Sequence, residues 1–228
     1  MKKIAIITLA VIMMVSCGGE SVSGLKENKI LGKIPAVYAI FIPEENALEK
    51  MQKEILDRSI DLNEDSEAEI ENEYMLYEKE KERVQKMFQK YEPVLEADIN
   101  KINGMNIPFI YTPAFEQLPC EIASLKIHIG SFNSLEMMIS VIARKDFYQR
   151  SMHLYYRMVA KDGSTIAKEK IYLFAFKDDS FTKGQHLSKD EFISTSLKVH
   201  ENPECWIDFA QIEFLTEEEY LRTKLTCK

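Results

Sequence analysis

The sequence predicts an α+β fold in which a helical hairpin is followed by an antiparallel β-sandwich. From Glu44 to about Ile102, apolar residues recur at intervals of three and four, which places them along one face of a helix. After Asn103-Gly104 the segments become short and rich in β-branched and aromatic residues, with turn residues between them. This change of pattern divides the chain into a helical hairpin region, residues 33–104, and a β-sandwich domain, residues 105–228.

Two helices account for the helical region. The first is expected to open at Pro43, because proline is favourable in the first turn of a helix. The second is expected from Glu67 to Glu92, and Pro93 should kink or restart it. A short loop between the two helices lets them run antiparallel and bury their apolar stripes against each other. The segment 34–42, before the first helix, is expected to be an extended strand.

Seven strands are expected in about 110 residues without intervening helices, which is typical of an antiparallel sandwich. Asp162-Gly163 lies between two of them and is a strong hairpin signal. In the strand before this turn, apolar residues alternate with polar or amphipathic ones, as expected when one face is buried. The expected strands are 107–112, 122–129, 136–143, 152–160, 166–176, 192–199 and 205–214.

The first sixteen residues have the order of an export signal: two lysines, a short apolar core and a small residue. The apolar core of about 12 residues is too short to span a bilayer. Met14-Val15-Ser16-Cys17 resembles the lipobox of bacterial lipoproteins, in which the signal peptidase cuts before a diacylated cysteine. The resemblance implies that Cys17 becomes the first residue and holds the protein to a membrane through its lipid. An ordinary secretory signal with an incidental cysteine is the alternative.

Residues 17–32 are rich in glycine and serine and are predicted to form a flexible tether. Removal of residues 1–16, with their two lysines, leaves 212 residues and shifts the formal charge from −8 to −10. This acidity argues against a nucleic-acid partner, which requires a basic patch. The expected location is the bacterial cell envelope, at the outer membrane or the cell surface.

One stretch of the β region carries a second resemblance. LYYRMVAKDGSTIAKEKIYLFAF, residues 154–176, resembles strands of immunoglobulin-like domains in bacterial envelope lipoproteins. It implies that the β-sandwich is immunoglobulin-like over roughly residues 106–216. The expected fold is therefore an α+β chain in which a helical hairpin is followed by an antiparallel immunoglobulin-like β-sandwich. A fold of this kind does not by itself imply a function.

The segment 61–72 offers a possible calcium site. Asp61, Asn63 and Asp65 stand at positions 1, 3 and 5 of an EF-hand loop, between two predicted helices. The pattern is incomplete, because Ser66 occupies the position of the required glycine and Asn72 that of the bidentate glutamate. The alternative is a capping box from Ser66 to Glu69, with acidic residues in the first turn of the second helix.

Two surfaces are candidates for binding. The first is an acidic hairpin tip that meets a basic partner, since residues 61–73 carry seven acids and no base; the alternative is a solvated helix face. The second is an exposed platform for a sugar or a peptide on two neighbouring strands; the alternative is a strand face packed under the helical hairpin. The tip residues are Glu67, Glu69, Glu71 and Glu73, and the platform residues are Tyr155, Arg157 and Tyr172.

Cysteine usage leaves the redox state open. Three cysteines follow Cys17, which allows one disulfide and one free thiol in an exported protein. Packed, reduced side chains at Cys120 and Cys205 are favoured slightly over a disulfide. Cys227, one residue from the end of the sequence, is expected to be mobile.

The sequence contains no catalytic signature: it has no G-x-S-x-G motif, no glycine-rich phosphate loop and no H-E-x-x-H motif. The prediction is therefore a non-catalytic binding or assembly module without a cofactor. Its expected partners are the membrane, through the lipid on Cys17, and an envelope protein or glycan. The alternatives are a calcium-binding envelope protein that uses the 61–72 loop and an envelope hydrolase whose site assembles in space.

Overall fold

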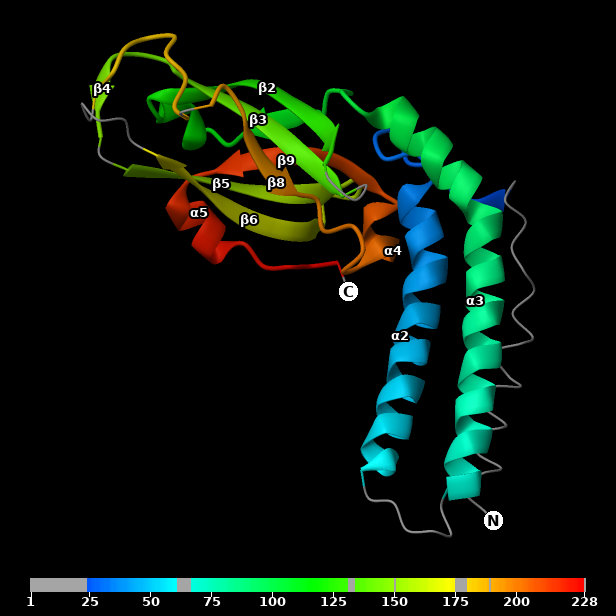
Figure 1. Ribbon diagram of the computed structural model, residues 1–228. Helices are drawn as coiled ribbons and strands as arrows, with labels where there is room; N and C mark the ends of the chain where they lie inside the picture. Colours follow the sequence, from blue (N-terminus) through cyan, green and yellow to red (C-terminus); the bar gives the residue numbers. More distant parts are fainter. Residues whose placement is uncertain are drawn as a thin grey trace.

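The computed structural model describes residues 24–60, 67–130, 134–149, 151–174, 180–188 and 190–227, with the backbone alone at Glu67 and Phe174. Two long antiparallel helices precede mostly antiparallel sheets, which confirms the α+β class (Figure 1). The helices are α2, Ile34–Ser59, and α3, Glu67–Ile102. They project together from one end of the sheets (Figure 1).

The segment 34–42 forms the first turns of α2, so the strand expected there is wrong. Its apolar side chains Ile34, Val37 and Phe41 have helical spacing and are buried along one face. Asp98 of α3 supports the start of the helix, because its carboxylate accepts a hydrogen bond of 2.6 Å from the Lys33 backbone N–H. A negative charge is favourable at a helix N-terminus, where backbone N–H groups lack partners within the helix.

Of the three prolines in the hairpin, Pro35 lies in the first turn of α2 and the other two lie inside helices. Pro43 lies in the middle of α2, and Pro93 lies nine residues before the end of α3. Pro93 was expected to kink or restart this helix. The helix does not restart there, and its axis bends toward its C-terminal end (Figure 1).

The β region contains two main sheets and a short ribbon. The first sheet has the order β1-β9-β5-β6 and the second the order β2-β3-β8, while β4 and β7 pair with each other. All pairs are antiparallel except β1 with β9. The strands are β1 Phe109–Tyr111, β2 Cys120–Ile129, β3 Leu135–Ala143, β4 Phe147–Tyr148, β5 Ser151–Ala160, β6 Thr165–Phe174, β7 Ser180–Phe181, β8 Ile193–Ser196 and β9 Phe209–Leu215.

Each of the seven expected strands has an observed counterpart, with shifted ends. The β5–β6 hairpin turns at Asp162-Gly163 as predicted, and Gly163 adopts a φ of 84°, which favours glycine. The last strand begins four residues later than expected, because Pro203–Trp206 forms the short helix α4. Two further short helices, η3 Phe115–Gln117 and α5 Glu217–Arg222, were not expected. The strand order does not confirm an immunoglobulin-like arrangement.

One core unites the sheets with the base of the hairpin. Its largest fully buried side chains include Trp206 of α4, Tyr156 of β5 and Phe214 of β9. The two sheets also meet through Tyr111 of β1, whose hydroxyl accepts a hydrogen bond of 2.9 Å from the Ile122 N–H of β2. The hairpin joins this core only near its base, where the ring centroids of Phe41 and Tyr91 lie 5.7 Å apart.

The segment before α2 is packed, so the flexible tether predicted for 17–32 does not hold for residues 25–32. Leu25, Ile30 and Leu31 are buried in the core. Between them, the buried Asn28 side chain donates hydrogen bonds to the carbonyls of Ile207 (3.0 Å) and Phe209 (2.8 Å). Its Oδ1 accepts from the backbone N–H groups of residues 30 and 31. The Asn28 amide therefore joins the segment before α2 to the connection between α4 and β9.

Replacing Asn28 should weaken the fold at this junction. We expect Asn28→Ala to lower the free energy of unfolding by about 2–3 kcal/mol, because it leaves buried backbone groups without partners. Asn46 is exposed on α2, so Asn46→Ala should change stability by no more than about 0.5 kcal/mol. Urea unfolding followed by circular dichroism measures both values. Equal stability of the two variants would contradict the role assigned to Asn28.

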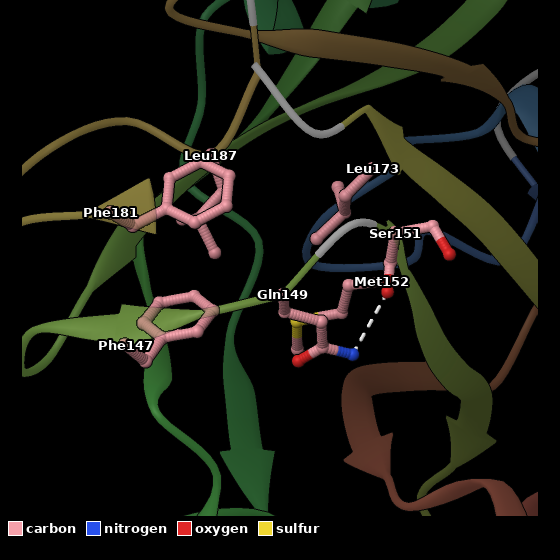
Figure 2. A pocket seen from close by; sticks show the side chains of 7 residues that line it. All are labelled: Phe147, Gln149, Ser151, Met152, Leu173, Phe181 and Leu187. Carbon is pink, nitrogen blue, oxygen red and sulfur yellow. Dashed lines mark hydrogen bonds between the residues drawn. The ribbon is translucent and has the colours of Figure 1, made fainter. Parts of the chain in front are cut away.

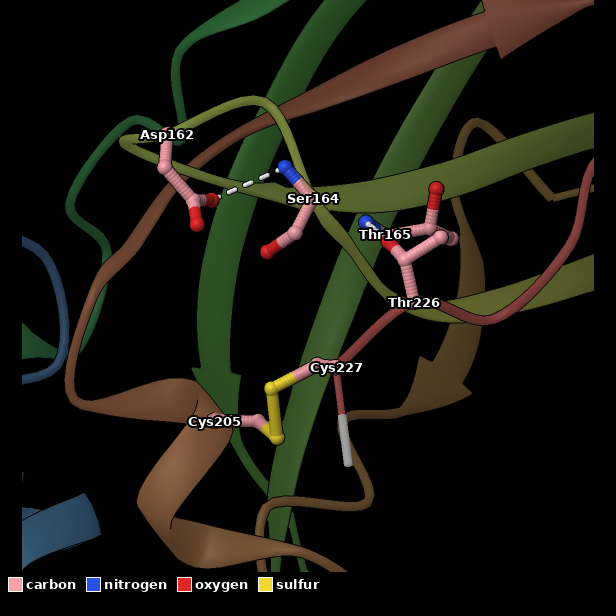
Figure 3. Close-up of a disulfide and its surroundings, with 6 residues drawn as sticks. All are labelled: Asp162, Ser164, Thr165, Cys205, Thr226 and Cys227. Carbon is pink, nitrogen blue, oxygen red and sulfur yellow. Dashed lines mark hydrogen bonds between the residues drawn. A yellow bond between two sulfur atoms is a disulfide. The ribbon is translucent and has the colours of Figure 1, made fainter.

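The C-terminal end is held by a disulfide between Cys205 and Cys227 (Figure 3), so the mobile Cys227 and the reduced Cys205 expected from the sequence are wrong. Their Cα atoms lie 6.0 Å apart across a sequence separation of 22 residues. Beside the disulfide, the Thr165 N–H donates to Thr226 Oγ1 (2.7 Å), and the Thr226 N–H donates to the Thr165 carbonyl (3.1 Å). Cys120 is buried with a free thiol, as expected.

The three cysteines should differ sharply in reactivity. Burial raises the pKa of the Cys120 thiol to about 12, so it should resist alkylation in the folded state. In a Cys17→Ala background, iodoacetamide should add no label to the native protein and one label after unfolding without reductant, as read by intact mass. Cys227→Ala should cost about 2–4 kcal/mol of stability, because the closed loop restricts the unfolded chain. In the labelling experiment, two or more labels on the unreduced, unfolded protein would contradict the disulfide.

Candidate functional site

The outer part of the helical hairpin exposes apolar side chains. We call residues 42–60 of α2 with residues 67–83 of α3 the distal hairpin. Among its described side chains, none is buried. Five large apolar residues there are between 54% and 81% exposed: Leu56, Ile60, Tyr74, Met75 and Leu76. The distal hairpin therefore presents to solvent the kind of residues that a core normally covers.

A groove runs between the two helices on one side of the distal hairpin. Its polar lining includes Glu71, Glu78 and Lys81. From Ile70 to Lys81 it follows about three turns of α3, or about 17 Å. The apolar side chains that line it are Ile55 and Leu56 of α2 and Ile70, Tyr74, Met75 and Tyr77 of α3.

Weak polar contacts join the two helices at this level. Arg58 of α2 pairs with Glu73 of α3, and Arg83 of α3 pairs with Glu44 of α2. Such partly exposed ion pairs contribute at most about 1 kcal/mol each. The apolar stripes, expected to bury each other, stay half-exposed here because two helices alone cannot enclose them.

The residues of the predicted acidic tip differ in their contacts. Glu69 and Glu71 are exposed, whereas Glu73 pairs with Arg58. For Glu67 only the backbone, at the first residue of α3, is described. The acidic tip therefore shares α3 with the groove, and Glu71 belongs to both.

The predicted calcium ligands Asp61, Asn63 and Asp65 lie outside the described residues. The second half of the 61–72 loop is helical, because α3 begins at Glu67. Asn72, at the position of the twelfth ligand, donates a hydrogen bond of 2.9 Å to the Ala68 carbonyl. Calcium binding stays a prediction.

The predicted platform lies on the outer face of the β1-β9-β5-β6 sheet, but the C-terminal residues 216–227 cross this face. Tyr155 packs against Tyr220 of α5, with ring centroids 5.1 Å apart. Burial, with the Glu217 carboxylate nearby, raises the pKa of the Tyr155 hydroxyl. Lys168 of β6 lies over the Tyr220 ring at 4.5 Å and donates to the Thr223 carbonyl. The covering element is thus α5 rather than the helical hairpin.

The other two platform residues, Arg157 and Tyr172, make separate contacts. Arg157 pairs with Glu213 of β9 and donates a hydrogen bond of 2.9 Å to Thr165 Oγ1. Tyr172 is exposed and lies beside His153, with ring centroids 5.1 Å apart. The three residues share one sheet face, but they do not form one open surface.

No cluster of three or more metal-ligating side chains occurs in the described ranges. One Ser–His pair exists there: Ser140 Oγ lies 3.1 Å from His186 Nδ1, but Ser140 is almost fully buried. A separate small pocket has mainly apolar walls, and the Phe147 and Phe181 rings stack there with their centroids 5.0 Å apart (Figure 2). Neither place presents an accessible nucleophile with converging polar groups.

A capping box that sequence reasoning missed holds the C-terminal segment in place. Thr216 and Glu219 cap α5 reciprocally, in the T-x-x-E pattern visible in the sequence. Thr112, just after β1, donates a hydrogen bond of 2.7 Å to the same Glu219 carboxylate. Burial acts to raise the pKa of Glu219, but the hydrogen bonds from Thr216 and Thr112 together lower it.

Acid should weaken this cap. Because the folded-state pKa of Glu219 lies below its ordinary value of 4.5, its stabilising effect is complete above that value and is lost as the pH falls through the folded-state pKa. Glu219→Gln should therefore be less stable than the wild type at pH 7, and the difference should shrink below pH 4.5. Melting temperatures of both proteins across this range measure the effect. A constant difference would contradict it.

Comparison of the chain with protein-family models, with curated proteins and with solved structures finds no match. Within the described part of the chain, no helix combines the length and the apolar character that a membrane span requires. Among the surfaces described above, the distal hairpin carries five large apolar side chains that are more than half exposed.

Proposed function

We propose that this chain is a lipid-anchored cell-envelope protein that acts as a non-catalytic binding module, with the distal hairpin as its contact surface. The exposed apolar cluster on the distal hairpin carries the proposal. Large apolar patches rimmed by polar residues on a soluble protein mark interaction sites. The aromatic contacts at the base, Phe41 with Phe88 and Tyr91, join the two helices, and Phe41 and Tyr91 belong to the core shared with the sheets.

Two observations support a location in the envelope, at the outer membrane or the cell surface. The residues that precede Cys17 resemble a lipobox, which implies a lipid anchor there. The Cys205–Cys227 disulfide fits an exported protein, because such bonds persist in oxidising compartments and are rare in the cytosol.

The β region serves in this proposal as the scaffold, and we regard it as an immunoglobulin-like sandwich. Support comes from the two sheets, which contribute to one core, and from the short β1 that pairs in parallel with the last strand. A protein partner is favoured over a glycan, because Tyr155 and Arg157 of the predicted platform are engaged by α5 and by Glu213.

Crosslinking in living cells tests the proposal. We expect the anchored protein to capture one specific protein partner, and Cys17→Ala to capture much less, since the unanchored chain leaves the membrane. The double variant Leu56→Ser/Met75→Ser should lose at least about 90% of the captured partner and keep its melting temperature, because both side chains are exposed.

Leu221→Ser is the matched control, since Leu221 is an exposed apolar residue on α5, away from the hairpin. It should capture the partner as well as the wild type does. Undiminished capture by the double variant would contradict the assignment of the surface. Turnover of a substrate by the purified protein would contradict the non-catalytic role.

A further inference from the structure

The groove on the distal hairpin lies between two helices, at the place where a third helix could pack against both. Its apolar side chains come from both helices, so a segment lying between them contacts α2 through Leu56 and α3 through Tyr74 at the same time. Amphipathic helices bind such grooves through apolar residues at intervals of three and four. Met75, which lines the groove, adds a flexible side chain that adapts to a partner's surface.

The charges around the groove indicate what kind of helix fits. Glu71 and Glu78 lie along it, and the one basic residue of its lining, Lys81, is already paired with Glu78 at 3.3 Å. At its outer end, residues 67–73 of α3 contain four acids and no base. An incoming helix with a basic polar face complements both features.

We propose that the groove binds a basic amphipathic helix supplied by a partner protein. This inference rests on the proposed function and adds the chemistry of the partner. The helix lies along α2 and α3 over about three turns, covers Leu56 and Tyr74 with its apolar side and places lysines or arginines beside Glu71. The distal hairpin thereby gains the buried layer that its own two helices do not form.

A second copy of the chain fits the groove less well. In an antiparallel pair centred on Tyr74, Glu71 of one copy approaches the turn that contains Glu78 of the other. In a parallel pair, Glu71 approaches its own counterpart. Both arrangements bring like charges together while water is being excluded, which is unfavourable.

Binding of a defined probe tests the inference. The probe is a fluorescein-labelled 18-residue helix of leucine, alanine and lysine with one leucine stripe, added to the full chain in zwitterionic nanodiscs. Fluorescence anisotropy should show saturable binding, with little binding by the same peptide carrying glutamate in place of lysine or by a scrambled peptide without the stripe. Empty nanodiscs provide the blank.

Variants of the chain show where the probe binds. Leu56→Ser, Tyr74→Ser and Glu71→Lys should each weaken binding by about tenfold or more. Glu96→Lys, at an exposed position further along the same helix, should change it less than about twofold. Equal loss from Glu71→Lys and Glu96→Lys would reduce the effect to general charge attraction and overturn the inference.

A photo-crosslinker at Met75 of the anchored chain in cells separates this inference from the proposed function. Adducts with another protein, combined with no stripe-dependent binding of the basic peptide, would overturn the helix proposal and leave the proposed function standing. Adducts mainly between two copies of the chain would overturn the helix proposal in favour of self-association. No protein adduct at Met75, together with no peptide binding, would overturn both.

Discussion

The architecture depends on a junction organised by the Asn28 amide. This buried side chain satisfies two N–H groups of its own segment and carbonyls of the α4–β9 connection, about 180 residues away in the sequence. Next to it, Gly32 turns the chain with a φ of 59° into α2, and its missing side chain leaves room for Asp98, which supports the start of that helix. The base of the hairpin is thus fixed to the β region by hydrogen bonds that water cannot easily replace.

The molecule consequently has two regions with opposite properties. Around the junction, the side chains of both helices and both sheets fill one core. Beyond Phe41 and Val84 the same helices continue without any buried side chain among the residues described there. A protein needs no such extension to fold, because the extension adds almost nothing to the core. In the function proposed above, its value lies in what it presents to a partner.

Much of the fold could be predicted because local patterns determine it. The 3–4 spacing marked the hairpin, and the alternation around Tyr156 marked β5. The packed segment around Asn28 and the disulfide were missed, because their partners are distant in sequence and glycine-rich composition resembles a tether. For the site, the acidic tip was visible in the sequence. The groove was not, because an apolar stripe looks the same whether another helix covers it or water does.

If Cys17 carries the proposed lipid, the docked segment before α2 limits how far the protein can extend from a membrane. Leu25 is fixed in the core, and Cys17 lies eight residues before it, which an extended chain spans with at most about 29 Å. The 26 residues of α2 add about 39 Å from the base of the hairpin to its tip. With a lipid on Cys17, these two lengths together come to about 70 Å, without the packed residues between Leu25 and Ile34. In the proposed arrangement, the number of residues between Cys17 and Leu25 would therefore limit which partners the hairpin tip can reach.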